Sequence, residues 1–301
     1  MILIISKDNE ITTTEVIKWL YHLGKNFIRV NEDEFFEIKM SNGKLALQSE
    51  RNSFLLDDIT SVWYRRGGIK FKRFHYQNDI VNIHMHETQH WLEDYVIHTL
   101  ESKNHISKQR KSHVNKLIVL EVAQKVGLNV PRYFLADNTQ DVKIGETIVK
   151  SITGNGVLQD IHKNYDGIMY TSVVHEEHPT NFFISFFQDK IEKDFEVRTF
   201  YLKGKIWSFA IISQNDEKTK VDFRKYNTAK PNRNVRYKLP ADTEERVHQL
   251  MQNLDLDCGS IDFIKGVDGM FYFLEINTVG QFTALSSITN YSLEKEIAEY
   301  L

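Results

Sequence analysis

The first thirty residues follow a strand–helix–strand pattern, and this pattern limits the fold more than any other feature of the chain. Residues 2–5 (ILII) are a short β-branched run, typical of a buried strand. Residues 14–20 have helical spacing with Gly24 as a stop signal, and residues 27–30 form a second strand-like run. A βαβ unit of this length packs a helix onto a sheet, so we expect the chain to open with an α/β domain.

The pattern further along the chain changes from mixed to mostly β. Trp63 and Trp91 are both expected to be core aromatics. We divide the chain into an N-terminal α/β domain (1–105), a central part (106–187) and a C-terminal part (188–301). Expected elements are a hairpin over 35–49, a strand over 61–66, helices over 79–101, 113–127 and 242–254, and strands over 146–150, 182–188, 196–201, 206–213, 260–264 and 270–276.

Composition excludes several classes of protein. The 301 residues carry 38 Lys and Arg against 41 Asp and Glu, a net charge of −3, so there is no basic excess for nucleic acid. The single cysteine, Cys258, excludes a disulfide framework and is expected to be a small core residue. The sequence has no apolar run long enough to span a membrane and no signal peptide. We therefore expect a folded cytoplasmic protein without nucleic-acid or membrane partners.

Three oxygen-bearing side chains gather at the two last predicted strands. Glu275 and Asn277 are two residues apart on a strand, so both point to one face, while Leu274 and Ile276 take the other. If the neighbouring strand pairs with this one, Asp262 joins them. Such ligands suit Mg²⁺, which also binds phosphate oxygens. The alternative is a solvated strand face.

A second group of residues is cationic. Lys150 ends a strand just before a glycine-containing loop at 151–157, and Lys116 lies in the preceding helix. Arg198 and Arg224 follow in the β-rich part. Backbone N–H groups of such a loop, together with these cations, can neutralise a polyphosphate. Each residue alone is more simply explained as a solvated surface charge.

A third pattern is the zinc-protease motif H-E-x-x-H. His86, Glu87 and His90 match it within the helix expected at 79–101, where both His would share a face. The motif is short, the chain has 12 His, and no residue stands out as a third ligand. A polar helix surface is the alternative explanation.

Taken together, these residues resemble those of the ATP-grasp ligases over 106–301, and more loosely over the first domain. Within that superfamily the chain is similar to the graspetide (microviridin-type) peptide maturases, and is most similar to their grasp-with-SPASM branch. The resemblance implies an ATP-grasp fold, in an α/β (α+β) protein with an N-terminal pre-ATP-grasp domain. The matching segments are 115–116 (NK), 148–150 (IVK), 196–198 (EVR), 274–277 (LEIN), 62–66 (VWYRR), 221–224 (VDFR), 259–262 (GSID), 280–282 (GQF), 208–214 (SFAIISQ) and 237–240 (YKLP).

The resemblance assigns a role to each matching position, with ATP and Mg²⁺ as cofactors. Residues 106–187 become the central ATP-grasp subdomain, and 188–301 the C-terminal one with the magnesium site. The implied roles are ATP-phosphate contacts for Lys116 and Lys150, a phosphate-covering loop with Gly154 and Gly156, an adenine hinge from Gln188 to Ile191, Mg²⁺ ligands in Asp262, Glu275 and Asn277, and catalytic charge stabilisation by Arg198 and Arg224.

The implied activity is ATP-dependent macrocyclisation of a ribosomal precursor peptide, with a leader and a core. A side-chain carboxylate is activated as an acyl phosphate, and a hydroxyl or amine of the same peptide closes an ester or amide link. The resemblance also implies a homodimer and a radical SPASM enzyme as further partners. The alternatives are an ATP-grasp amino-acid (glutamate-type) ligase acting on a protein or small acceptor, a zinc peptidase using His86, Glu87 and His90, and a non-catalytic peptide-binding module on a decayed ligase scaffold.

Overall fold

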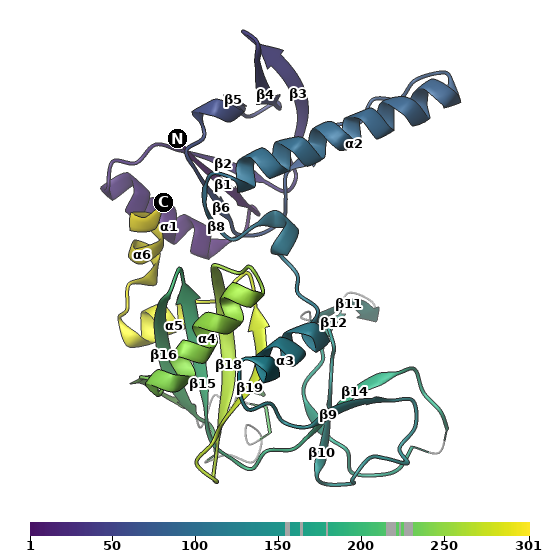
Figure 1. Cartoon of the computed structure of the whole chain (residues 1–301), viewed down its shortest axis with the longest axis vertical. Coiled ribbons are helices and arrows are strands. Elements are labelled where there is room, and N and C mark those ends of the chain that lie inside the picture. The colour runs from purple at the N-terminus through teal and green to yellow at the C-terminus, as the bar shows by residue number, and fades with distance from the viewer. Residues whose placement is uncertain (154–156, 163–164, 179, 215–220, 223, 226–230) are drawn as a thin grey trace. The chain divides into compact units, whose positions relative to one another are not determined.

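The computed structural model of the chain divides into two compact units (Figure 1). Unit 1 comprises Met1–Ser112 and Ser292–Leu301, and unit 2 comprises His113–Tyr291. The structure describes residues 1–153, 157–162, 165–178, 180–214, 221–222, 224–225 and 231–301. No helix in these described stretches is long and apolar enough to cross a membrane.

Unit 1 is built on a parallel sheet in the order β2-β1-β6-β8. Its fully buried strand β1 and the following helix α1 form the predicted βαβ unit with β2. Helix α6 packs against α1, so the residues that follow unit 2 in the sequence belong to unit 1. The elements are β1 (Ile2–Ser6), α1 (Ile11–His22), β2 (Phe27–Asn31), β6 (Ser61–Tyr64), β8 (Asn104–Ile106) and α6 (Leu293–Tyr300).

A second sheet and a long helix complete unit 1. Strands β3 and β4 form the predicted hairpin, turning at Asn42 and Gly43, both with positive φ. Helix α2 has the predicted bounds, but only Val96, Ile97 and Leu100 near its end are buried. The remaining elements are β3 (Phe35–Ser41), β4 (Lys44–Gln48), β5 (Ser53–Leu55), η1 (Leu56–Asp58), β7 (Lys70–Phe71), α2 (Asp79–Glu101) and η2 (Gln109–Lys111).

The two predicted core tryptophans differ in their surroundings. Trp63 on β6 is 2% exposed, which confirms the prediction, whereas Trp91 on α2 is 66% exposed. The prediction for Trp91 was wrong because only the C-terminal end of α2 packs on the core of unit 1. Cys258 is buried, as expected.

Unit 2 contains two larger sheets. Strands β9, β10, β13 and β14 form one sheet in the order β13-β10-β14-β9, and β15 to β19 form the other in the order β17-β16-β15-β18-β19. The bounds are α3 (Lys116–Lys125), β9 (Tyr133–Ala136), β10 (Thr147–Lys150), β11 (Val157–His162), β12 (Tyr165–Ile168), β13 (Ser172–Val173), β14 (Ser185–Asp189), β15 (Lys193–Leu202), β16 (Lys205–Ile212), β17 (Arg233–Tyr237), α4 (Ala241–Asn253), β18 (Cys258–Gly266), β19 (Phe271–Asn277) and α5 (Thr283–Thr289).

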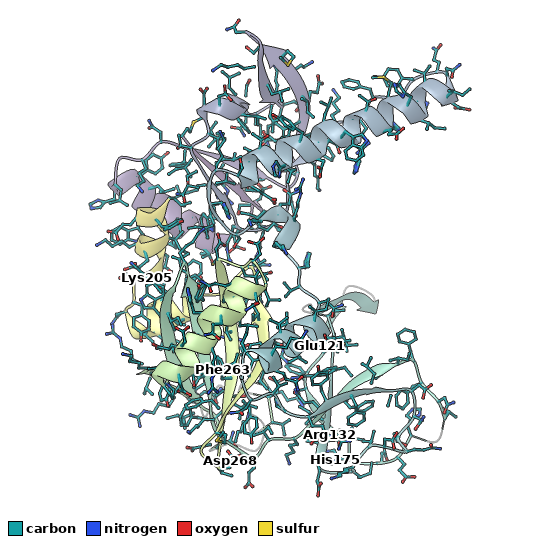
Figure 2. The ribbon with its side chains drawn as sticks, viewed as in Figure 1. Glu121, Arg132, His175, Lys205, Phe263 and Asp268 are labelled. Atoms are coloured by element: carbon teal, nitrogen blue, oxygen red, sulfur yellow. The ribbon has the colours of Figure 1, made fainter. Side chains whose placement is uncertain are left out.

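Helices α3 and α4 cover one face of the five-stranded sheet (Figure 1). The core between these helices and the sheet includes Phe263 on β18, which is labelled in Figure 2. Its ring packs edge-on against the ring of Phe273, with 5.8 Å between the ring centroids. Because strand side chains alternate, burying this face leaves the intervening residues of β15 and β18 on the opposite face. That opposite face carries the polar residues singled out from the sequence.

The division into units differs from the predicted domain boundaries. The first unit extends to Ser112 rather than to residue 105, and it also takes in 292–301, which the sequence placed in the C-terminal part. Helix α6 explains the difference, because its apolar residues Leu293, Ile297 and Ala298 are buried within unit 1.

Candidate active site

A cavity of about 140 Å³ in unit 2 is lined by residues of both sheets. Three of its charged residues lie side by side across the five-stranded sheet. Arg198 on β15 pairs with Asp262 on β18, and Asp262 pairs with Glu275 on β19. Paired residues share a face, so all three point into the cavity. Eight predicted site residues line it, namely Lys116, Lys150, Gln188, Ile191, Arg198, Arg224, Asp262 and Glu275.

A β-bulge at Leu274 turns Glu275 into the cavity. Asp262 pairs with Glu275, but the next residue, Phe263, pairs with Phe273, so Leu274 is an extra residue on β19. The bulge lets Phe273 stay in the core while Leu274 and Glu275 both line the cavity. The expectation that Leu274 shares the opposite face with Ile276 was therefore wrong.

Lys116 links three elements around the cavity. Asn115 caps α3 by accepting hydrogen bonds from the N–H groups of Leu117 and Ile118, which fixes Lys116 as the first residue of the helix. Its Nζ lies 2.8 Å from Oε2 of Glu275 and donates to the carbonyl oxygen of Ser151 at 3.0 Å. The side chain is 10% exposed, so this ammonium is held between β19 and the start of the loop after β10.

Lys150 is the last residue of β10, where the sequence placed it. Its Nζ lies 5.9 Å from the ring centroid of Phe186 on the neighbouring strand β14. Burial and the nearby positive charge of Lys116 lower the pKa of Lys150 to about 8, although Glu275 and Asp262 act against this shift. Lys150 is thus a cation whose charge is sensitive to its surroundings.

The carboxylates of the cavity are held by opposite charges. Arg198 donates from Nε and Nη2 to the two carboxylate oxygens of Asp262, each at 2.8 Å, and Asp262 in turn raises the pKa of Arg198. Burial alone would raise the pKa of Glu275, but Lys116, Lys150 and Arg224 outweigh it and hold that pKa below its usual range. The carboxylate of Glu275 is therefore ionised near neutral pH.

Gln188 brings an unusual polar group to the cavity. The residue lies on β14, is 1% exposed and lines the cavity beside Ile148 and Ile191. Neither its amide nitrogen nor its amide oxygen has a hydrogen-bond partner among the residues that the structure describes. The N–H donors and the oxygen acceptor of this buried amide are unused, so they can form hydrogen bonds with a ligand that is rich in nitrogen and oxygen atoms.

Arg224 reaches the cavity from the segment after β16. Asp222, which is almost fully buried, accepts hydrogen bonds from the backbone N–H, Nε and Nη2 of Arg224 at 3.0, 2.9 and 2.6 Å. Burial would raise the pKa of Asp222, but the Arg224 guanidinium holds it below its usual range. Asp222 also accepts from the N–H of Thr171 at 3.0 Å, which ties this segment to the one after β12.

Sequence reasoning missed a buried ion pair next to the cavity. Nζ of Lys193 lies 2.6 Å from Oε1 of Glu196, and the two side chains are only 4% and 10% exposed. Ser213 donates to the other carboxylate oxygen at 3.1 Å. Burial raises the pKa of Glu196 despite these partners. The two residues are three apart on β15, a spacing that would put them on opposite faces of a regular strand.

Within the described residues, one predicted site residue, Asn277, is not part of this assembly. Asn277 pairs with Ser260, two positions along each strand from the pair of Asp262 with Glu275, and it is exposed and does not line the cavity. Gly154 and Gly156 lie outside the described residues, so the predicted role of their loop stays a prediction.

The zinc-protease motif lies on α2 of unit 1. His86 makes a hydrogen bond through Nε2 with the backbone oxygen of Phe74 at 3.1 Å. No group of three or more His, Cys, Asp or Glu side chains that could hold a metal ion occurs within the described ranges. The motif therefore gains no third ligand from the fold.

Comparisons with known proteins agree with the fold of both units. Residues 1–113 match the model of the MvdD pre-ATP-grasp domain. A RiPP-associated ATP-grasp ligase of Chryseobacterium gregarium, solved with ADP and a leader and core peptide, is 25% identical, with a TM-score of 0.79 over 99% of this chain and 94% of that one. The chain has the fold of the ATP-grasp ligases. The expected ATP-grasp fold, with an N-terminal pre-ATP-grasp domain, is thus confirmed.

Two further structures resemble this chain over its whole length. Macrocyclase MdnC of Microcystis aeruginosa MRC, bound with precursor peptide MdnA, is 24% identical with a TM-score of 0.76, covering 100% of this chain and 99% of that one. Macrocyclase MdnB of the same organism is 20% identical with a TM-score of 0.74, covering 100% and 98%. A comparison with curated protein sequences gave no match. The cavity described above is therefore the candidate active site within this ATP-grasp fold.

Proposed function

We propose that the ligase activates side-chain carboxylates of a ribosomal precursor peptide with ATP and closes macrocyclic ester or amide links in it. The observation that carries this proposal is the aligned set of Arg198, Asp262 and Glu275 in one cavity, flanked by Lys116 and Lys150. This combination of cations and carboxylates suits a metal-bound polyphosphate. Two similar enzymes, from Chryseobacterium gregarium and Microcystis aeruginosa, were solved with their peptides, which supports a peptide substrate.

Nucleotide binding is assigned to the first residue of α3 and to residues of the four-stranded sheet and the segment after it. Lys116 and Lys150 supply positive charge for the phosphates, and the unused amide of Gln188 offers a donor and an acceptor to the base. Ile148 and Ile191 provide apolar surface next to it. The presence of Gln188 and Ile191 in the cavity lining supports the proposal that the segment from Gln188 to Ile191 is the adenine hinge.

The carboxylates of Asp262 and Glu275 fit Mg²⁺. They are hard oxygen donors, they are direct partners across two strands, and no hydrogen bond within the described residues reaches Oε1 of Glu275. Asp262 keeps lone pairs beyond those used by Arg198. When bound here, the metal ion would neutralise charge on the phosphates. Asn277 stays a predicted third ligand.

The chemistry follows in two steps. The γ-phosphoryl group of ATP passes to an Asp or Glu carboxylate of the peptide, giving an acyl phosphate and ADP. A Thr or Ser hydroxyl, or a Lys amine, of the same peptide then attacks the acyl carbon, loses its proton and displaces phosphate. Arg198 and Arg224 provide fixed positive charge for the transferring group, and no covalent protein nucleophile is needed.

Calorimetric titration with ADP, with and without Mg²⁺, tests the nucleotide half of the proposal. We expect saturable, Mg²⁺-dependent binding that disappears in Lys150→Ala and persists in Lys125→Ala, a change of an exposed lysine at the end of α3. Absence of binding by the unmodified protein at millimolar nucleotide would contradict the assignment of the cavity.

Mass spectrometry tests the peptide half. Small peptides encoded beside the gene are incubated with the enzyme, ATP and Mg²⁺, and loss of one water per link indicates macrocyclisation. A gain of amino-acid residue masses would instead identify an amino-acid ligase. The grasp-with-SPASM branch, the homodimer and the radical SPASM partner stay predictions of the sequence resemblance.

A further inference from the structure

The buried pair of Lys193 and Glu196 has no place in the chemistry above, yet it lies next to the proposed active site. Glu196 lines the cavity, whereas Lys193 does not. Both side chains are more deeply buried than the Arg198–Asp262 pair, whose exposures are 24% and 21%. A buried ion pair contributes little net stability, because removing two charges from water costs about as much as their attraction returns. Its presence therefore calls for an explanation other than stability.

A β-bulge creates this pair. Lys193 pairs with Gly266 and Phe195 with Lys265, so Asp194 is an extra residue on β15. The extra residue places Lys193 on the same face as Glu196, while Phe195 joins the core on the other side. Bulges of this kind commonly re-aim side chains beside active sites.

The ammonium of Lys193 is aimed at a backbone carbonyl as well as at Glu196. Its Nζ donates to the carbonyl oxygen of Val221 at 3.1 Å. Val221 directly precedes Asp222, whose carboxylate holds Arg224 through three hydrogen bonds and accepts a fourth from Thr171. A chain of contacts thus runs from Glu196 through Lys193 to Val221, and on to Arg224.

We propose that Lys193 and Glu196 form a clamp that positions Arg224 in the nucleotide cavity. Glu196 is fixed by Ser213 on one side and orients Lys193 on the other, and Lys193 fixes the backbone at Val221. Asp222 then transmits this position to the Arg224 guanidinium, which is 45% exposed. Lys193 is on this account a positioning residue, because it acts only through the segment that carries Arg224.

The same segment joins two parts of the cavity wall. Nζ of Lys225 lies 5.5 Å, and Cζ of Arg224 6.0 Å, from the ring centroid of Tyr170, which neighbours Thr171. Met169, Tyr170 and Thr171 all line the cavity. When the backbone at Val221 is held in place, Asp222 is held as well. Asp222 in turn holds the part of the cavity wall formed by residues 169–171, after β12.

A double-mutant cycle on the affinity for a non-hydrolysable ATP analogue, AMPPNP, tests the clamp, and this test rests on the nucleotide half of the proposed function. We expect Lys193→Met to weaken AMPPNP binding about tenfold in the unmodified protein, and less than about twofold once Arg224 is replaced by Ala. Lys203→Met is the matched control: Lys203 follows the other end of β15, is ion-paired with Asp257, and does not line the cavity. An equal loss of affinity with and without Arg224 would overturn the proposal.

Hydrogen exchange provides a readout that does not need nucleotide. The N–H groups of Thr171 and Arg224 donate to Asp222, so both should exchange faster in Lys193→Met than in Lys203→Met. Unchanged exchange at both positions overturns the clamp, whereas a protein that shows faster exchange but binds no ADP contradicts only the proposed function. If Lys193→Met does not fold, the neutral pair Lys193→Met/Glu196→Gln, which leaves no buried unpaired carboxylate, takes its place in both experiments.

Discussion

Helix α2 in unit 1 and the cavity in unit 2 both carry the residue types of a metal-dependent enzyme, but they present them differently. On α2, His86, Glu87 and His90 come from one helix, and His86 bonds with the backbone oxygen of Phe74. In the cavity, the charged residues come from α3, β10, β15, β18 and β19, and those of β15, β18 and β19 lie in register.

The two arrangements differ in their effect on the free energy of folding. Polar residues on an exposed helix keep their water, so a short motif can occur there by chance. Charged residues from distant elements can share a partly buried cavity only if each is paired, because desolvation otherwise disfavours the folded state. Converging unlike charges, with pKa values shifted by burial and by one another, therefore mark a site more reliably than a contiguous motif does.

The largest effect is expected from removing a cavity charge. Lys150→Ala and Glu275→Ala should each lower the rate of ATP-dependent product formation by about 10²–10³-fold, because each removes charge fixed next to the phosphates. The rate is followed by mass spectrometry of the precursor peptide, with Lys125→Ala as the control. Near-normal turnover in either cavity variant would mean that catalysis takes place at another site.

Removing one partner of an ion pair should lower the free energy of unfolding more in the cavity than on α2. Arg198→Leu leaves Asp262 partly buried without its main partner, so we expect it to lower the free energy of unfolding by about 1–3 kcal/mol. Arg73, which pairs with Glu93 on α2, is 43% exposed, and Glu93 also accepts a hydrogen bond from Gln89, so Arg73→Leu should cost less than about 1 kcal/mol. Urea unfolding measures both, and equal losses would argue that the cavity pair is an ordinary surface pair.

The pH dependence of ADP binding should reflect Lys150. Its pKa is lowered to about 8, so the free protein loses this charge as the pH rises above 8, and ADP affinity should then fall by up to about tenfold per pH unit. In the absence of ADP, the same shift makes the stability contribution of Lys150 rise between pH 8 and its unfolded-state value, since only the unfolded chain then stays protonated. Lys150→Arg, which stays charged, should flatten the affinity profile; an unchanged profile would assign the titration to another group.

The smallest effect is expected on α2. His86→Ala and His90→Ala, singly or together, should leave ATP-dependent turnover unchanged, because neither side chain lies in the cavity lining. Metal analysis of the purified protein is the direct check. Stoichiometric zinc that is lost in the double variant, together with peptide hydrolysis, would restore the zinc-peptidase hypothesis.

Periodicity predicted several of the observed elements, including α2 to its observed bounds, and it put Asp262 beside Glu275 on the condition that the two strands pair, which they do. It was not sufficient at the two bulges. An extra residue in a strand reverses which residues share a face, and neither Asp194 nor Leu274 differs from an ordinary strand residue in the sequence. The Lys193–Glu196 pair was missed for this reason.

Trp91 shows a different limit of sequence reasoning. Its type predicts burial, but whether a long helix packs along its whole length depends on the size of the surface beneath it, which no local pattern records. The polar residues of α2 before Val96 were in retrospect the available signal.

Helix α6 has a consequence for how the protein is made. Its residues Leu293, Ile297 and Ala298 are buried within unit 1 and pack near α1, yet a ribosome synthesises them after all of unit 2. Unit 1 can therefore be completed only after residue 300 has been synthesised. Until then, the surface of α1 that contacts α6 stays uncovered. A fragment ending at residue 112 carries the same exposed face permanently, so the two units are not independent in biosynthesis even though each has its own core.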